Sequence, residues 1–147
     1  MSRAKPSTIR KGRRNPAGFR TSLMSDTKWR KLFSALDRPG LELRQAMVKF
    51  VDSDDVHVIS TPTSEALRTP KPYIDTFKFG PIALREIEWI EFPALAEYPN
   101  PSPDGKGRVP STRVKQDIDR AEAVLADVGR FPTQRTERGL RITGHSR

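Results

Sequence analysis

Apolar residues between positions 26 and 38 recur with the period of an α-helix. Four large side chains follow the i, i+3, i+4, i+7 spacing that gathers them on one face, namely Trp29, Leu32, Phe33 and Leu36. Basic residues between them point the other way. Ser25 or Asp26 can cap the first turn, and Pro39-Gly40 stops the pattern. The sequence therefore predicts a first amphipathic helix at this place.

The pattern then changes to the period of a β-strand. Across residues 43–51, three apolar positions alternate with three others: Ala46, Val48 and Phe50 against Gln45, Met47 and Lys49. The run Asp-Ser-Asp-Asp at 52–55 has turn chemistry, and Val56 to Ile59 opens a second strand that Thr61-Pro62 ends. We expect a β-hairpin. Residues 63–69 are expected to form a short helical turn, and prolines punctuate the loop that follows.

The segment 85–92, REIEWIEF, predicts a further strand that ends at Pro93. Simple alternation puts Ile87 and Trp89 on one face and Glu86, Glu88, Ile90 and Phe92 on the other. Trp29 and Trp89 are accordingly expected to be buried in the core, as large aromatic side chains commonly are.

Residues 98–110 are rich in proline and glycine and predict a long surface loop. A second helix is expected to begin at a cap on Ser111 or Thr112 and to end at Gly129. Its apolar stripe comprises Val114, Ile118, Ala121, Leu125 and Val128. Residues 134–144 predict a last hairpin that turns at Arg138-Gly139, with Leu140 and Ile142 in the returning strand.

Strands that follow one another in sequence, with helices at either side, indicate an α+β fold: a small antiparallel sheet with two amphipathic helices packed on one face. A chain of 147 residues is typically one domain. We expect one domain at 22–147 and a disordered basic arm at 1–21, because the arm has almost no large apolar side chain to bury.

Positive charge is concentrated in that arm. The chain carries a net charge of +9, and residues 1–20 hold seven basic residues and no acidic one. The remainder has 20 basic and 18 acidic residues, a net charge of only +2. Met24 opens the phrase MSDTKWRKLF, so two readings stay open for residues 1–23: part of the native protein, or an extension from a mis-chosen start codon.

Composition excludes several classes of protein. The absence of cysteine removes disulfide frameworks, cysteine-rich zinc sites and thiolate chemistry. No apolar run approaches the ~20 residues that cross a bilayer, and the basic N-terminus has no apolar segment of a secretory signal behind it. We expect a protein that does not contact membranes.

No motif for catalysis, a metal or a cofactor stands out. His57 and His145 are far apart in sequence, and His145 lies where chain ends fray. Asp52, Asp54 and Asp55 resemble the start of a calcium loop, but Val56 follows where an oxygen ligand is required. The basic run 105–108, GKGR, follows a proline-rich loop instead of a strand, unlike a phosphate-binding loop. We expect no catalytic residue, no metal and no cofactor.

Carboxylates along the predicted strand at 85–92 suggest a protein-binding surface. Glu86, Glu88 and Glu91 are interpreted as an exposed acidic stripe that meets a basic partner, with Asp54 and Asp55 beside it. The leading hypothesis is a non-enzymatic protein-binding module. The alternative is a nucleic-acid-associated protein whose Arg10, Lys11, Arg13 and Arg14 contact the phosphate backbone without sequence preference.

Three phrases resemble a known family. LMSDTKWRKLF (23–33), REIEWIEF (85–92) and GRFPTQRTERGLRITGH (129–145) are similar to sequences of DUF6678, a family of small bacterial proteins. The resemblance covers about residues 22–145 and implies a bacterial cytoplasmic protein. It supplies no activity and no catalytic residue. Small α+β proteins of this type often act as immunity proteins that occlude a toxin's active site, which is an analogy at the level of the fold.

Overall fold

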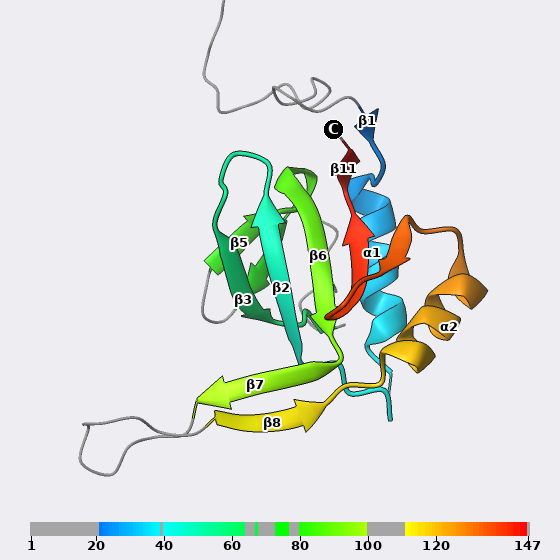
Figure 1. Ribbon diagram of the computed structural model, residues 1–147. Helices are drawn as coiled ribbons and strands as arrows, with labels where there is room; N and C mark the ends of the chain where they lie inside the picture. Colours follow the sequence, from blue (N-terminus) through cyan, green and yellow to red (C-terminus); the bar gives the residue numbers. More distant parts are fainter. Residues whose placement is uncertain are drawn as a thin grey trace, which may run out of the picture.

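The computed structural model of the chain describes residues 21–38, 40–63, 67, 73–76, 80–99 and 111–146 (Figure 1). Its main feature is an antiparallel sheet with the strand order β3–β2–β6–β10–β9. These strands are β2 (Gln45–Phe50), β3 (Val56–Ser60), β6 (Ile87–Pro93), β9 (Thr133–Arg135) and β10 (Gly139–Thr143). Helices and antiparallel sheets are thus combined in one chain, as expected of the α+β class.

The first helix forms where the apolar period predicts it. Helix α1 (Asp26–Leu36) begins after Ser25, whose Oγ accepts a hydrogen bond from the Lys28 N–H at 3.0 Å. All four predicted apolar side chains are buried, and the Trp29 ring stacks on Phe33 with 5.7 Å between centroids. Gly40, with a φ of 87°, turns the chain after the helix.

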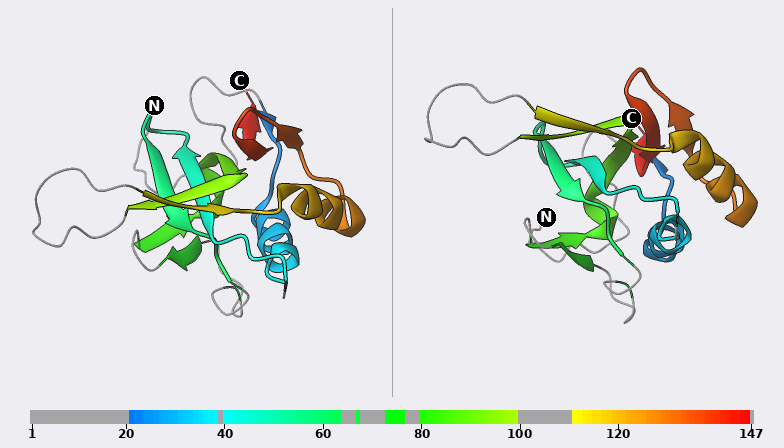
Figure 2. Two further views of the ribbon diagram at one scale, coloured as in Figure 1. Left: turned by 60° about the horizontal axis from the view of Figure 1, so that its bottom comes forward. Right: turned by 90° about the horizontal axis from the view of Figure 1, so that it is seen from below.

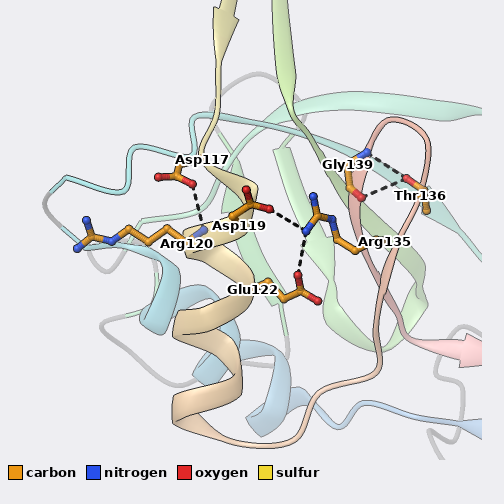
Figure 3. Close-up of polar contacts among 7 residues, drawn as sticks. All are labelled: Asp117, Asp119, Arg120, Glu122, Arg135, Thr136 and Gly139. Carbon is orange, nitrogen blue, oxygen red and sulfur yellow. Dashed lines mark hydrogen bonds and ion pairs between the residues drawn. The ribbon is translucent and has the colours of Figure 1, made fainter.

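The second helix begins later than the sequence predicts. Residues 111–115 form strand β8, and α2 (Ile118–Val128) starts after Asp117, whose carboxylate accepts from the Arg120 N–H at 3.0 Å (Figure 3). The expected cap at Ser111 or Thr112 is therefore wrong, because Asp117 supplies the cap nearest to the buried stripe. The predicted end at Gly129 is confirmed.

Three short strand pairs complete the described part of the chain. Strand β7 (Leu95–Pro99) pairs with β8 (Ser111–Lys115), and this hairpin projects from one end of the sheet (Figures 1 and 2). Strand β4 (Tyr73–Thr76) pairs with β5 (Gly80–Ala83), and β1 (Thr21–Ser22) pairs with β11 (His145–Ser146). Residues 98 and 99 were expected in the loop at 98–110, and residues 111–115 at the start of a helix, so this strand pair is a correction.

The core lies between the five-stranded sheet and α1, which runs behind the sheet in Figure 1. Helix α2 adds its own buried stripe and packs against α1 and β10. The inward side chains of the three central strands are entirely buried: Ala46, Val48, Ile90, Phe92, Leu140 and Ile142. The predicted hairpins β2–β3 and β9–β10 are both confirmed.

A β-bulge changes which side chains of β6 face inward. Lys49 of β2 is opposite Trp89, whereas the next residue, Phe50, is opposite Ile87, so Glu88 is the additional residue. Ile87 consequently joins the core and Trp89 faces away from it. The expectation that Ile87 and Trp89 share a face, and that Trp89 is a core residue, is wrong for this reason.

Several sequence predictions lie outside the described residues. They are the arm at 1–20 with its four candidate phosphate contacts, the GKGR run at 105–108 and most of the expected helical turn at 63–69. His145 corrects another expectation: it is 7% exposed in β11, and its Nε2 lies 2.7 Å from the carbonyl oxygen of Arg85. Strand pairing and this contact hold the segment that was expected to fray.

Candidate functional site

The outer face of the five-stranded sheet, opposite α1, is the candidate functional site. Strand register places a row of side chains across it, with each residue opposite the next: Val58, Met47, Glu91, Arg141 and Gln134. A second row contains Val56, Lys49, Trp89 and Thr143. In Figure 1 this face is turned to the viewer, with α1 and the β4–β5 pair behind the sheet. The two rows therefore bring together residues up to about ninety positions apart in sequence.

An arginine and a tryptophan stack at the centre of this face. The Arg141 guanidinium carbon lies 3.9 Å from the centroid of the Trp89 ring, within cation–π range. The same guanidinium donates through Nε to Glu91 Oε1 at 2.9 Å. Glu91 is only 2% exposed, whereas the Arg141 side chain is 33% exposed. Arg141 thus neutralises a buried carboxylate and still reaches the surface.

A second ion pair lies at the bulge of β6. Lys49 Nζ contacts Glu88 Oε1 and also donates to the carbonyl oxygen of Phe50 at 3.3 Å. Both side chains of the ion pair are close to nine-tenths buried. Buried carboxylates of this kind require a cation, because an unpaired buried charge costs several kcal/mol. We call Met47, Lys49, Glu88, Trp89, Glu91 and Arg141 the outer-face cluster.

These pairs correct the expectation of an exposed acidic stripe. Glu88 and Glu91 are buried and matched by cations, so they present little negative charge to solvent. Glu86 is half-buried in a 3₁₀ turn (Leu84–Glu86), and its carbonyl oxygen accepts from the Val51 N–H at 2.9 Å.

Asp54 and Asp55 remain exposed in the turn between β2 and β3, where the Asp55 N–H donates to Ser53 Oγ at 3.0 Å. Turn chemistry at 52–55 is therefore confirmed. Val51 leads into this turn, so Glu86 lies beside it. Of the five predicted carboxylates, three lie at this end of the sheet and two lie within the outer-face cluster.

Two glutamine side chains fasten the β7–β8 hairpin to β2. Gln116 Oε1 accepts from the N–H groups of Arg44 and Gln45 at 2.8 and 2.9 Å. Its Nε2 donates to the carbonyl oxygens of Gln45 and Pro93 at 3.1 and 2.7 Å. Gln45 in turn pairs with the backbone N–H and carbonyl of Glu97. Strands β7 and β8 do not pair with the five-stranded sheet, so these side-chain hydrogen bonds connect the hairpin to it instead of backbone pairing.

This attachment creates a hollow of about 870 Å³ between the hairpin and the edge of the sheet. Its lining includes the exposed apolar side chains Val58, Tyr98 and Val114, together with Ser60, Lys115 and the two glutamines. Tyr98 and Val114 lie on the same face of the hairpin, since Ala96 pairs with Val114 and is two residues from Tyr98. The hollow opens beside β3.

No protein-family model, curated protein or solved structure matches the chain, so its function is inferred from the chemistry of the residues described above. Among the residues that the structure describes, no three histidine, cysteine or acidic side chains are grouped to hold a metal. His57 lies on the inward face of β3, with its ring tilted against Phe50 at 5.8 Å. No described helix is long and apolar enough to span a membrane.

The outer-face cluster is the feature that sequence reasoning missed. Its acidic members were named, but their cations Lys49 and Arg141 lie on other strands. A partial signal existed: Arg141 alternates with the apolar Leu140 and Ile142, which predicts that it faces away from the core. Its partner could not be found without the register of β6 against β10.

Proposed function

We propose that this chain is a non-enzymatic protein-binding module, of the immunity or regulatory kind, that holds its partner on the outer-face cluster. The observation that carries the proposal is the half-buried Trp89 ring beneath Arg141, on a sheet face that no described helix covers. Tryptophan, arginine and methionine are enriched at protein interfaces, and tryptophan and arginine are among the residues that contribute most of the binding energy.

The internal ion pairs make this face suitable for burial by a partner. Lys49 neutralises Glu88 and Arg141 neutralises Glu91 within the free protein. A docking protein would therefore cover a surface whose charges are already paired, which lowers the desolvation cost of binding. Exposed Asp54 and Asp55, with Glu86 nearby, would contact basic groups at the rim and accelerate association.

The deciding experiment compares Trp89→Ala with Phe131→Ala, a matched control because Phe131 is another half-buried aromatic residue, outside the cluster. Full-length proteins are incubated with nuclease-treated lysate of the source cells, and retained proteins are identified. A partner held by wild type and by the control, but lost with Trp89→Ala, supports the site. For the immunity type, that partner's toxic activity falls when the chain is added.

The rim carboxylates have their own test. Asp54→Lys is expected to slow association with the captured partner by about tenfold or more at low salt, since charge at an interface chiefly steers encounter. Asp127→Lys makes the same charge change on an exposed residue of α2. Equal association rates for the two variants would show that Asp54 does not face the partner.

The alternative function rests on a different observation, the seven cations without an acid in residues 1–20. In that case, nucleic acid that wild type retains is lost by the variant in which four basic residues are changed to Gln: Arg10, Lys11, Arg13 and Arg14. Raising the salt concentration is also expected to release nucleic acid from wild type. Trp89→Ala would leave such binding unchanged. The two functions are therefore separated by which variant loses its ligand.

The proposal extends to membership of DUF6678 and to a bacterial cytoplasmic location. The three phrases that carry the resemblance form α1, β6 and the β9–β10 hairpin. These elements contribute core residues from both the helix and the sheet, so the resemblance includes residues that help to specify the fold.

A further inference from the structure

The charged atoms that the outer-face cluster exposes are those of a cation. Glu88 and Glu91 are buried, so their carboxylate oxygens lie beneath the surface. The Lys49 side chain, paired with Glu88, is also close to nine-tenths buried. Among the charged members of the cluster, Arg141 has the largest exposed fraction. A docking protein therefore meets guanidinium nitrogens at the centre of this face, not carboxylate oxygens.

Arg141 is held in place and still has unused hydrogen-bond donors. Its Nε–H donates to Glu91, and its guanidinium carbon lies over the Trp89 ring. Among the described residues, no acceptor binds the N–H groups of its Nη1 and Nη2, and these two atoms are not buried. A guanidinium presents its N–H groups as a rigid fork that fits a carboxylate. Because Trp89 and Glu91 already orient this fork, little entropy is lost when a carboxylate binds.

A second arginine reaches the same place from the turn between β9 and β10. Arg138 is exposed, and its Nη1 lies 3.5 Å from the sulfur atom of Met47 on β2. Strand register puts Met47 and Arg141 opposite Glu91 on its two sides, so the two arginine side chains approach Glu91 from both sides. A thioether sulfur is a weak acceptor, which a carboxylate oxygen would readily replace.

Arg138 differs in its charge balance from Arg135, which belongs to the same hairpin. Arg135 contacts Glu122 at 3.0 Å and Asp119 at 2.9 Å, and these hydrogen bonds, that to Glu122 first, raise its pKa (Figure 3). For Arg138, no described carboxylate lies within ion-pair distance, although Glu137 precedes it in the turn. Arg138 is thus a cation that the described part of the chain leaves unmatched.

We propose that Arg141 and Arg138 form a carboxylate site, which takes one aspartate or glutamate side chain of the protein that docks on the outer-face cluster. This inference rests on the proposed function, because the docking protein supplies the carboxylate. The Nη groups of Arg141 are the main donors, and Arg138 closes the site on the side of β2. Met47 and Trp89 provide apolar surface around it, which excludes water and strengthens the ion pair.

The charge of the cluster favours a carboxylate over a phosphate. Lys49 with Glu88 and Arg141 with Glu91 are neutral pairs, so Arg138 is the cation left to be matched. One negative charge matches it. A phosphate carries up to two, and the additional charge would lie near the carboxylate of Glu91.

The position of the site also orients the docking protein. The β2–β3 turn lies beside the start of β6, and the β9–β10 turn lies beside its end. Asp54 and Asp55 are thus at one end of the outer face and Arg138 is at the other. A partner with an acidic anchor for the arginines and basic groups for the rim carboxylates would bind in one direction only.

Adjacent residues of opposite charge provide the first test. Arg138 and Glu137 are both exposed in one turn, so their changes to glutamine are matched variants. Arg138→Gln is expected to weaken binding of the purified, captured partner by about tenfold or more at low salt, whereas Glu137→Gln leaves the affinity unchanged or raises it. Arg141→Lys keeps a cation beside Glu91 but loses the fork, so it is also expected to weaken binding. Equal effects of the two glutamine variants, or a larger loss with Glu137→Gln, overturn the carboxylate site.

Carbodiimide coupling of the complex identifies the anchoring residue. Arg138→Lys places an amine in the site, and the carbodiimide joins an amine to a contacting carboxylate as an amide, with the lost water taken up by the carbodiimide. Mass spectrometry is expected to find this position joined to an aspartate or glutamate of the partner. Arg120→Lys, at an exposed position of α2, is the control that does not couple to the partner. A complex that forms without coupling at position 138 contradicts the proposal.

Sodium acetate is a probe that needs no partner. At constant ionic strength, NMR signals of the Arg141 and Arg138 side chains are expected to shift at lower acetate concentrations than that of Arg120. Equal responses of the three arginines overturn the site. Failure of the proposed function is recognised separately, since a partner held equally by wild type and by Trp89→Ala refutes that function. A partner that depends on Trp89 but not on Arg138 refutes the carboxylate site alone.

Discussion

Replacement of Gln116 by alanine tests how the β7–β8 hairpin is held. The side chain of Gln116 makes four hydrogen bonds, all to backbone groups that have no strand partner at that place. Alanine removes all four partners at once and leaves the polar backbone groups behind. The hollow beside β3 depends on this attachment, so the substitution affects both the stability of the protein and the shape of that hollow.

The magnitude follows from which groups water can reach. Arg44 is exposed, so its N–H can bond to water after the substitution. Gln45 and Pro93 are buried, and three of their backbone groups lose a partner. At about 1 kcal/mol for each net hydrogen bond, or more where the group stays dry, the loss is about 3–4 kcal/mol. This is a large part of the ~5–15 kcal/mol by which most domains are stable.

Urea unfolding monitored by tryptophan fluorescence measures this loss. With a slope of about 1.5 kcal/mol per molar urea, the midpoint of Gln116→Ala falls by about 2–3 M. Gln116→Glu keeps the acceptor but cannot donate, so it is expected to be no better than alanine. Exposed Gln134 is the control, and its change to alanine costs less than about 0.5 kcal/mol. A Gln116→Ala midpoint within error of that control would refute the reasoning.

Three further substitutions have defined outcomes in the same unfolding assay. Arg141→Ala leaves the buried carboxylate of Glu91 without its cation and costs about 2–3 kcal/mol, less than the ~3–5 kcal/mol for a wholly buried pair because Arg141 is one-third exposed. Adding Glu91→Gln is expected to recover part of this loss. If the double variant is as unstable as Arg141→Ala alone, the pairing is contradicted. Gly139→Ala puts a Cβ 2.0 Å from the Phe92 carbonyl oxygen, so the pairing of β10 with β6 must shift and the stability falls by about 2 kcal/mol or more. A variant as stable as wild type would disprove this close approach. Ser25→Ala removes the cap of α1 and costs about 1 kcal/mol, whereas Ser25→Asp retains it; equal losses would argue against capping.

Local sequence signals predicted the elements that depend on neighbouring residues. Helix α1 has its cap, its apolar period and its stop within sixteen residues, and all three agree. The hairpins β2–β3 and β9–β10 each turn within a few polar residues. In these segments local preference and tertiary packing favour the same structure, which is why the pattern sufficed.

Predictions failed where distant contacts decide the conformation. The bulge at Glu88 depends on how β6 meets β2, and strict alternation cannot show it. Strands β7 and β8 have exposed apolar residues, and β7 ends in a proline, so they do not resemble buried strands. Gln116 stabilises them through backbone atoms about seventy and twenty-three residues away. The outer-face cluster likewise depends on register between β6 and β10, fifty residues apart, and no local preference encodes it.

The strand order also has a consequence for how fast the chain folds. Central strand β6 pairs on one side with β2, about forty residues earlier, and on the other with β10, about fifty residues later. Closing such long loops costs entropy before any pairing compensates for it, so folding in milliseconds to seconds is expected, not microseconds. During synthesis, Ile90 and Phe92 cannot be fully enclosed until β10 has left the ribosome. In that interval the apolar face of β6 is the part of the nascent chain most exposed to chaperones and to aggregation.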